Sequence, residues 1–417
     1  MFRIIDIARE ISSGITPLRS NSEYWENGTI PWLKTEQIGE YRIKTTNEFV
    51  TEKALESTGL KLYPKNTISI AMYGEGKTRG NVSIIDCPMT TNQACCNIVV
   101  NESIVAPFYL YYFFKTQYHN LRQLSSGVRK NLNSNDIKNY LINLPNKITQ
   151  QNIVNFLCSI DEKIELNNKI NLELEKFAKT LYEYWFVQFD FPDENERPYK
   201  SSGGKMVYDE ILKRDIPVGW EVENISKYCN IIDCLHSKKP DFCYEANNLY
   251  LLQLENLTND GYIDITNKYY ISKDDYKSWT QKIEIQENDF VFTNAGRTGA
   301  FGKIPKYIKC ALGRNLTAIR PISISPYYLR MYFGSNDMRQ QVLSNLDCGA
   351  FFKSFNVKSI KLIALLIPQE NILNNFILKI SPIIKQIETN NIETQFLTEV
   401  RDFLLPMLMN GQVTIRQ

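Results

Sequence analysis

Two long stretches of the chain carry apolar residues at alternating spacings of four and three positions. They cover residues 149–189 and 368–412. This spacing places the apolar side chains at the a and d positions of a heptad repeat, which is typical of helices that pair as a coiled coil. The positions expected at the interface are Ile160, Ile164, Asn167 and Leu174 in the first stretch, and Ile383, Ile387, Asn390 and Leu397 in the second.

An asparagine interrupts both apolar seams at the same point of the pattern, Asn167 in the first and Asn390 in the second. A polar residue at an interface position fixes the register of a coiled coil at some cost in stability. The alternative is that each helix packs only on its own globular region. We favour pairing, because the two helices match and each alone would expose an apolar stripe.

Residues 1–148 and 218–367 follow a different pattern. Short β-rich runs such as NTISIAMY and DFVFTNA alternate there with glycine-containing turns, and an aromatic amphipathic stretch follows, PFYLYYFF or PYYLRMYF. This mixture predicts an α+β fold for both regions. Residues 190–217 are instead rich in Pro, Gly, Ser and charge, which predicts an exposed linker.

These elements occur twice, in one order and at a near-constant offset of about 220 residues. FRIIDIAREI matches WEVENISKYC in pattern, and WLKTEQIG matches LLQLENLT. PKNTISIAMYGEGKTRG matches QENDFVFTNAGRTGAFG, and the aromatic stretches match each other. The opening of the first helical stretch, LINLPNKITQQNIVNFLCSIDEKIELNN, matches IALLIPQENILNNFILKISPIIKQIETNN. The chain is therefore an internal duplication of a globular domain followed by a long helix.

Composition narrows the class of protein. With 43% hydrophobic and 23% charged residues, the chain resembles an ordinary globular protein. It has no apolar run long enough to cross a bilayer and no secretory leader at its start, so we expect a cytoplasmic protein without a membrane association. The nine cysteines form no CxxC and only two histidines accompany them, so we expect reduced cysteines and no metal site.

The net charge of +2 is unevenly distributed. Residues 1–148 contain 17 basic and 13 acidic residues, and residues 218–367 contain 18 and 15, whereas the helical stretches and the linker together are acidic. Two positive blocks joined by neutral or acidic connectors suit two nucleic-acid-binding units.

A resemblance to a known family covers the whole chain. The central stretch PYKSSGGKMVYDEILKRDIPVGWE, preceded by LYEYWFVQFDFP, resembles the central region of specificity (S) subunits of type I restriction-modification systems. The two-fold repeat, in which each half closes in a helix of the pattern LP…Q..I…L..ID.KI.LN, is the layout of the same family.

The resemblance implies two target recognition domains, residues 1–148 and 218–367, separated by two long antiparallel coiled-coil helices that act as a ruler. Each domain would read one half of a bipartite asymmetric site in double-stranded DNA. It further implies a non-catalytic subunit whose partners are two methyltransferase (M) subunits and two restriction and motor (R) subunits. S-adenosylmethionine, ATP and Mg²⁺ would then bind only to those partners, and this chain would hold no cofactor.

Glycine-rich loops that follow a predicted strand in both halves are the first candidates for DNA contact. The first half offers Lys77 and Arg79, and the second offers Asn294, Arg297 and Thr298. Arginine can fork onto guanine or clamp a phosphate, and asparagine can pair with adenine. The alternative is a glycine-rich hairpin with solvated charges.

Corresponding turns supply a second set, Asn92 and Gln93 in the first half with Arg314 and Asn315 in the second. Amides on a turn suit base edges, although turns use asparagine for local hydrogen bonds equally well. A third pair of loops provides candidate phosphate anchors, and early strands provide weaker candidates. These are Arg129, Lys130 and Lys353 for the loops, and Lys34, Gln37 and Gln253 for the strands.

Enzymatic readings fit the residues less well. SPYY at Ser325 approaches the motif with which amino-methyltransferases hold a base, but its counterpart at Ala106 lacks the acceptor and no FxGxG loop accompanies it, so we interpret it as a helix start. A nuclease at Asp193 lacks the ExK that should follow. The main rival is a scaffold whose duplicated domains bind protein. Salt-dependent binding to duplex DNA would separate the two, because phosphate contacts release counterions.

Overall fold

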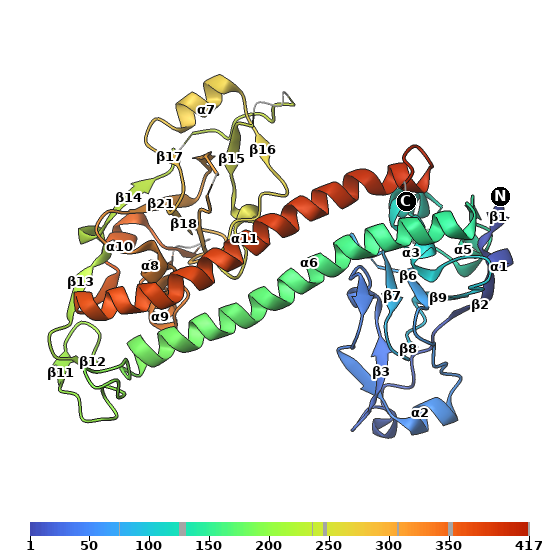
Figure 1. Ribbon diagram of the computed structural model, residues 1–417, viewed down its shortest axis with the longest axis horizontal. Helices are drawn as coiled ribbons and strands as arrows, with labels where there is room; N and C mark the ends of the chain where they lie inside the picture. The colour runs from blue at the N-terminus through green and yellow to red at the C-terminus, as the bar shows by residue number, and fades with distance from the viewer. Residues whose placement is uncertain are drawn as a thin grey trace. The chain divides into compact units, whose positions relative to one another are not determined.

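The structure is a computed structural model, and it describes residues 1–74, 76–124, 131–235, 237–244, 248–306, 308–348 and 353–415, without the side chains of residues 347, 348, 353 and 354. The chain divides into two compact units. Unit 1 comprises Met1–Glu165 and Phe396–Gln417, and unit 2 comprises Leu166–Gln395. The fold is α+β, as predicted, with two globular parts and two long helices, α6 (Lys147–Tyr182) and α11 (Glu370–Met409), that contribute residues to both units (Figure 1).

The globular part of unit 1 is built on two sheets with strand orders β2-β9-β6-β7-β4 and β5-β3-β8. Their strands are β2 (Ala8–Ser13), β9 (Cys95–Val100), β6 (Ile68–Ala71), β7 (Val82–Ile85), β4 (Arg42–Ile43), β5 (Glu48–Val50), β3 (Ile30–Leu33) and β8 (Thr90–Thr91). A short pair, β1 (Phe2–Arg3) with β10 (Leu141–Ile142), closes the domain. Its helices are α1 (Ile4–Ile7), α2 (Glu52–Ser57), α3 (Pro107–Thr116), α4 (Tyr118–Gln123) and α5 (Ser134–Lys138).

Unit 2 has sheets of order β14-β21-β18-β19 and β16-β15-β20-β17. Their strands are β14 (Cys229–Asp233), β21 (Leu316–Pro321), β18 (Phe290–Thr293), β19 (Phe301–Lys303), β16 (Tyr269–Tyr270), β15 (Tyr250–Leu252), β20 (Cys310–Leu312) and β17 (Glu284–Ile285). Two short pairs complete the strands: β13 (Glu221–Asn224) with β24 (Ala364–Ile367), and β22 (Asp347–Cys348) with β23 (Lys353–Ser354). Its helices are α7 (Lys273–Trp279), α8 (Pro326–Phe333), α9 (Asn336–Ser344) and α10 (Val357–Lys361).

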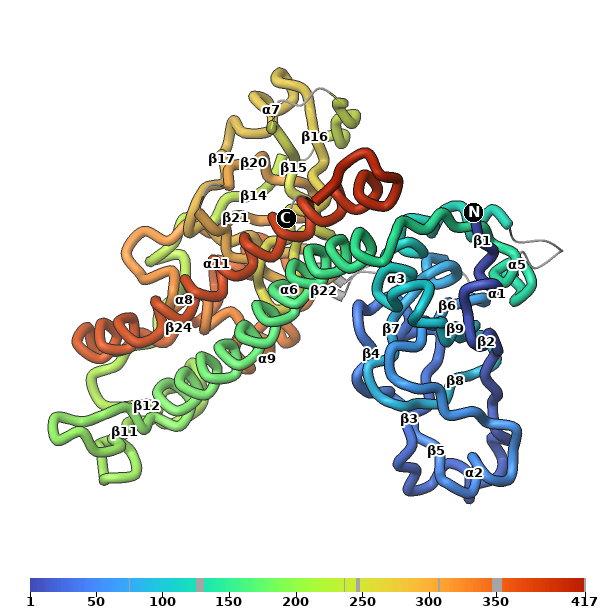
Figure 2. Tube along the Cα trace, turned by 45° about the vertical axis from the view of Figure 1, so that its right-hand side comes forward, coloured from blue at the N-terminus to red at the C-terminus, as the bar shows by residue number. Residues whose placement is uncertain are grey.

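The two globular parts share one topology, which confirms the duplication predicted from the sequence. The order β2-β9-β6-β7 matches β14-β21-β18-β19, and β5-β3-β8 matches β16-β15-β20. Even the parallel pairing recurs, with Trp32 opposite Thr90 in one unit and Leu251 opposite Ala311 in the other. β4 and β17 are edge strands that each extend a different sheet, so the copies differ at their margins (Figure 2).

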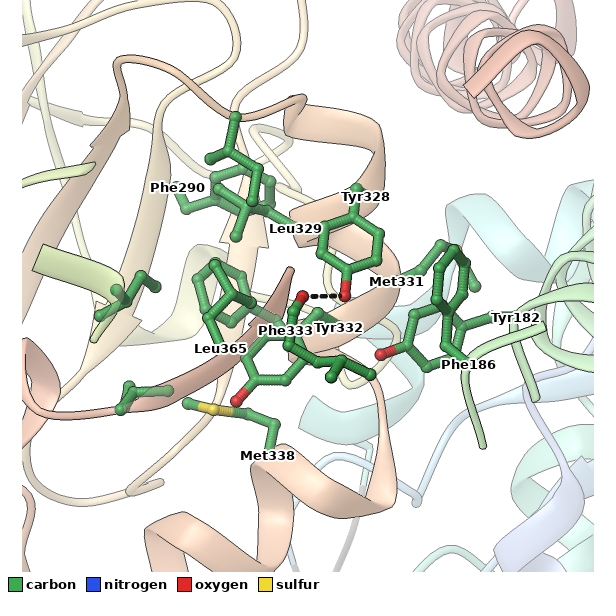
Figure 3. Close-up of a cluster of buried hydrophobic side chains, with 14 of the residues drawn as sticks. Tyr182, Phe186, Phe290, Tyr328, Leu329, Met331, Tyr332, Phe333, Met338 and Leu365 are labelled. Atoms are coloured by element: carbon green, nitrogen blue, oxygen red, sulfur yellow. Dashed lines mark hydrogen bonds between the residues drawn. The ribbon is translucent and has the colours of Figure 1, made fainter. Parts of the chain in front are cut away.

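An aromatic helix packs on the five-stranded sheet of unit 1 and on the β14-β21-β18-β19 sheet of unit 2, as the amphipathic pattern predicted. In unit 1, α3 buries Tyr109, Tyr111, Tyr112 and Phe114. In unit 2, α8 contributes Tyr328 to a cluster that also contains residues of α6 and of the sheet (Figure 3). The Tyr328 hydroxyl donates to the Leu366 carbonyl at 2.6 Å, so the polar end of this buried ring is satisfied.

The long helices pair and also pack on the globular parts, so both alternatives from the sequence hold in part. In unit 2, Asn167 lies 3.4 Å from Thr394 and Asn171 lies 2.8 Å from Asn390, which is an antiparallel register. The predicted interface positions Ile160, Asn167, Ile387 and Asn390 are buried, whereas Ile164, Leu174, Ile383 and Leu397 are half-buried. Against the heptad pattern, Ile384 is fully buried beside Ile383, because this stretch of α11 also faces the globular core.

The prediction of an exposed linker at residues 190–217 holds for exposure, because most of these residues are exposed, but the segment is also folded. The segment contains a β-hairpin, β11 (Met206–Asp209) with β12 (Arg214–Pro217), after a π-helical turn at Glu183–Val187. Phe191 stacks on Tyr199 and Trp220 with ring centroids 4.7 and 5.1 Å away. Aromatic stacking outweighs the polar composition here, and the segment is a folded part of unit 2.

Candidate nucleic-acid interface

The candidate loops of unit 1 leave the sheet at one common end. β6 and β9 are antiparallel with Ala71 opposite Cys95, so the loop after β6 and the turn before β9 are neighbours. The Asn92 amide donates to the Leu33 carbonyl at 2.9 Å, which brings Lys34 to the same place. The Leu132 amide donates to the Met72 carbonyl at 3.1 Å, so the segment after the third loop returns there as well.

Unit 2 repeats this arrangement. Thr293 lies opposite Leu316, and the Asn294 amide donates to the Asn315 carbonyl at 2.9 Å. The Phe355 amide then donates to the Asn294 carbonyl at 2.8 Å. We call this end of each globular part its loop end. The structure thus brings together, in both copies, the candidate segments that the sequence places far apart.

The described part of the unit 1 loop, residues 76–80, depends on glycine and on α4. Gly80 has a φ of +88°, a conformation that L side chains rarely adopt. The Tyr118 hydroxyl donates to the Lys77 carbonyl at 2.8 Å, and the Arg122 guanidinium donates to the Arg79 carbonyl at 3.1 Å. Lys77 itself is exposed and Arg79 is half-buried. Sequence reasoning missed Tyr118 and Arg122, whose i, i+4 spacing on a helix beside a basic loop was the available signal.

The corresponding loop of unit 2 is anchored by one of its own candidates. Arg297 is exposed, yet its guanidinium donates to the Leu257 carbonyl at 2.6 Å and to Oδ1 of Asn259 at 2.5 Å. The Asn294 side chain has a structural role, because its Oδ1 accepts a hydrogen bond from the Thr317 hydroxyl on the neighbouring strand at 2.8 Å. Thr298 is half-buried.

Gln37 was predicted on an early strand, but it lies in a 3-10 turn (Thr35–Gln37) after β3, where its amide holds a neighbouring loop. Gln37 accepts from the Asn47 amide at 3.0 Å and donates to the Thr45 carbonyl at 3.4 Å. Asn256, its counterpart in the repeat, donates to the Asp264 and Asn267 carbonyls, both at 2.9 Å. The Gln37 amide, a weaker candidate for DNA contact, is therefore occupied by a loop of the protein itself.

Lys34 and Gln253 occupy equivalent positions and both have protein partners. The Lys34 ammonium forms ion pairs with Glu48 at 2.6 Å and Glu36 at 3.0 Å, and these hydrogen bonds raise its pKa. Gln253 accepts from the Lys239 ammonium at 2.7 Å. Neither side chain is fully exposed, so the two lie at the margin of the loop ends.

The turns before β9 and β21 contain both structural and exposed residues. Oδ1 of Asn92 accepts from the Ala94 amide at 3.1 Å, so this side chain shapes its own turn. Gln93 is exposed and accepts from the Thr16 hydroxyl. Arg314 and Asn315 are both exposed, and Asn315 adopts a φ of +61°, which asparagine tolerates better than most residues.

Three candidates lie wholly or partly outside the described residues. They are Arg129, Lys130 and the side chain of Lys353. Among the candidates that are described, five side chains are exposed at the loop ends: Lys77, Gln93, Arg297, Arg314 and Asn315. Ammonium and guanidinium groups bind phosphates, and guanidinium and amide groups can also hydrogen-bond base edges in the major groove.

The enzyme-like motif is a helix start, as the sequence indicated. Ser325 caps α8 by accepting a hydrogen bond from the Tyr327 amide at 3.3 Å, with Pro326 in the first turn. Within the described ranges, no three His, Cys, Asp or Glu side chains gather where they could hold a metal ion. The cysteines whose surroundings are described are free thiols. No described helix is both long enough and apolar enough to cross a membrane.

Comparison with known proteins agrees with this geometry. A family model, the type I restriction modification DNA specificity domain, matches residues 1–176. The type I restriction enzyme MjaIX specificity subunit of Methanocaldococcus jannaschii is 26% identical over 422 residues, covering 100% of this chain and 93% of the relative. This chain is related to the type I specificity subunits.

Two further type I specificity subunits illustrate the range of similarity. The EcoR124I/EcoR124II specificity subunit of Escherichia coli is 28% identical over 184 residues, which cover 43% of this chain and 45% of that subunit. The crystal structure of the type I restriction-modification S subunit from M. genitalium has a TM-score of 0.58 at 17% identity, covering 98% of this chain and 95% of that one. That likeness is one of fold, two globular domains linked by long helices.

Proposed function

We propose that this chain is the DNA-reading subunit of a type I restriction-modification complex. Each globular part reads one half of a bipartite asymmetric site in double-stranded DNA through its loop end. The chain performs no catalysis itself, and it directs adenine methylation and restriction by partner subunits. These partners are two methyltransferase and two restriction subunits, which bind S-adenosylmethionine, ATP and Mg²⁺.

The observation that carries this proposal is the recurrence of the loop end in both copies of the duplicated fold. In each copy, a glycine-containing loop, a polar turn and the segment after a third loop meet at one end of the corresponding sheet, which contains β6 and β9 in unit 1 and β18 and β21 in unit 2. A scaffold that binds protein does not need the same end of both domains to carry exposed cations and amides such as Lys77 and Arg314. Duplicated DNA readers do, because each must bind phosphates and base edges.

The loop ends differ in detail, and this difference supports an asymmetric site. The loop after β6 presents Lys77 where the loop after β18 presents Arg297, and Gln93 in the turn before β9 corresponds to Arg314 in the turn before β21. Lysine and arginine differ in geometry, because the guanidinium forms paired hydrogen bonds and the ammonium acts as a point charge. Two copies with unlike side chains in corresponding loops would read unlike half-sites.

Mapping methylated adenines genome-wide, in cells that express this chain with its cognate methyltransferase, tests the proposal. We expect one motif made of two unlike half-sites separated by unread base pairs. Cells with the methyltransferase alone provide the control and should lack the motif. Absence of any motif dependent on this chain, together with salt-independent binding to duplex DNA by the purified complex, would contradict the proposal and favour a protein scaffold.

A further inference from the structure

A buried ion pair joins the globular part of unit 2 to α11. The ammonium of Lys303, at the end of β19, lies 2.7 Å from Oε1 of Glu388 on α11. The Lys303 side chain is 1% exposed and that of Glu388 is 13% exposed. Exposed ion pairs contribute little to stability, but a pair this deeply buried has lost its water and depends on its partner's position.

A second buried ion pair joins the same globular part to α6. Arg330 on α8 is 3% exposed and lies 3.1 Å from Oε1 of Glu175 on α6. Glu175 also accepts a hydrogen bond from the Tyr262 hydroxyl. The guanidinium of Arg330 lies over the Tyr262 ring, 4.6 Å from its centroid, and over the Phe301 ring at 5.3 Å. The globular part of unit 2 therefore has a buried charged contact with each long helix, and we call these two contacts the junction ion pairs.

The duplication shows that the fold does not require these charges. The β6–β7 and β18–β19 registers place Lys303 opposite Phe290, as Ile84 lies opposite Ile68, so Lys303 corresponds to Ile84. Arg330 corresponds to Tyr111 in the aligned aromatic helices. Ile84 and Tyr111 are both fully buried, so the same places in unit 1 are filled without a cation.

A buried ion pair contributes little net free energy to the stability of a domain. Desolvation of both ions offsets most of their attraction, and well-packed apolar residues of similar volume often stabilise a protein as much or more. Apolar contact, however, tolerates small rotations, whereas charged hydrogen bonds hold a defined distance and direction. Two such contacts, one to each helix, resist rotation of the domain about either one.

We propose that the junction ion pairs fix the orientation of the second recognition domain on the helix pair and thereby restrict the DNA spacer length that the complex accepts. This inference rests on the proposed function. Lys303, Glu388, Arg330 and Glu175 are positioning residues here, and none of them is assigned a DNA contact. Their removal should leave both half-sites unchanged and broaden the accepted spacer, because a less firmly oriented domain reaches its half-site over a wider range of DNA geometries.

The test replaces both members of one pair, so that no lone charge stays buried. Lys303→Met with Glu388→Leu is compared with Lys227→Met with Glu223→Leu, a control that removes an ion pair of the same unit whose side chains are 55% and 35% exposed. Methylated adenines are mapped genome-wide for each chain with its cognate methyltransferase, and thermal unfolding monitors the fold. We expect the double variant to methylate sites with the wild-type half-sites and a spacer one base pair longer or shorter, severalfold above wild type. The control should keep the single wild-type spacer.

Several outcomes would overturn the inference. If the double variant folds and keeps the wild-type spacer distribution, at full or reduced activity, the ion pair contributes only to stability and does not restrict the spacer. Failure of the double variant to fold would contradict the premise that the fold does not need these charges. A second variant, Lys303→Arg with Glu388→Asp, keeps both charges and should keep the single spacer; broadening there would also count against the idea. If wild type itself gives no bipartite motif, the proposed function fails instead.

Discussion

At the residue scale, the candidates divide according to what already contacts them. Gln37, Asn92 and Asn294 have the chemistry to read bases, yet their amide groups hold a loop, a turn and a neighbouring strand. Their partners lie close in space, and those of Asn294 and Gln37 are distant in sequence, so pattern alone could not reveal them. Lys77 and Arg314 stay exposed because they lie on loops where the backbone supplies the structure.

Arg297 is the most informative single substitution. Its guanidinium is exposed while it anchors the loop to Leu257 and Asn259, so it can contribute to DNA binding directly or by holding the loop in shape. We expect Arg297→Ala to weaken recognition of the second half-site by about 1–3 kcal/mol if it contacts a base, or equally for all sequences if it contacts phosphate. Methylation rates on sites altered in one half at a time measure this.

Asn259→Ala provides the matched control for Arg297. It removes one anchor of the guanidinium but leaves the guanidinium itself in place. If Asn259→Ala reproduces the full loss, loop order is the cause and direct contact is rejected. Unchanged binding and methylation in Arg297→Ala would support the alternative interpretation, in which the loop is only a glycine-rich hairpin with solvated charges.

At the element scale, the sequence predicted most of what it could encode locally. Heptad spacing identified both long helices, and the repeat identified two copies of one sheet topology, because both signals extend over many residues. Prediction from the sequence failed where tertiary packing outweighs local composition. The polar stretch at residues 190–217 folds because Phe191 is stacked between Tyr199 and Trp220, and Ile384 is buried because α11 faces both a helix and a globular core.

The polar layer between the helices is more extensive than one asparagine per helix. The Asn390 side-chain amide donates to Oδ1 of Asn171 at 2.8 Å, and Asn171 in turn donates to Oδ1 of Asn391 at 2.8 Å. We expect Asn171→Ala to lower the free energy of unfolding by about 1–3 kcal/mol, because it leaves the buried amide of Asn390 without this acceptor. Urea unfolding measures the change. Asn168→Ala, at an exposed position of the same helix, should have almost no effect, and equal losses in both variants would contradict the polar layer.

The helix pair can be lengthened without breaking this register. We consider an insertion of one heptad in α6 between Asn171 and Leu174 and another in α11 between Ile387 and Asn390, which face each other across the pair. Each adds about 10 Å of helix, roughly three base-pair rises. We expect the spacer between half-sites to lengthen by about that amount, with both half-sites unchanged. Adenine methylation mapping tests this, and full activity on the original spacer would show that the helices are not the ruler.

At the scale of the whole molecule, duplication makes the two recognition domains separable in function while the helices stay shared. Each unit contains its own loop end and its own cores, and the printed contacts of the described candidates lie within their own unit. Such independence would allow one chain to read the proposed asymmetric site with two copies of one fold. It also means that specificity in one half can change without disturbing the other.

Exchanging residues 1–148 for those of another type I specificity subunit should therefore change only one half of the recognised sequence. The exchange has a structural condition, because the domain is attached to α6 through contacts with the acids of that helix. Tyr112 donates to Asp161 at 2.6 Å, Arg42 pairs with Glu162 at 2.9 Å, and Lys44 pairs with Glu165. A donor domain without the Tyr112 hydroxyl would leave Asp161, which is 2% exposed, with its Arg401 ion pair at 2.6 Å but with one hydrogen bond fewer, and an unmet hydrogen bond at a buried group costs about 1–3 kcal/mol.

We therefore expect donors that carry a hydroxyl at position 112 to give stable, active hybrids, and donors that lack it to give less stable ones. The cations at positions 42 and 44 should matter little, because the acids that they pair with are 57% and 30% exposed. Active hybrids should methylate a motif that joins a new first half-site to the original second half-site, at the original spacer. Motif mapping of several hybrids, with thermal unfolding as the measure of stability, examines both statements. A hybrid in which both half-sites changed would mean that the two domains are coupled through the helices, and the modular account would have to be replaced by one in which α6 and α11 transmit specificity.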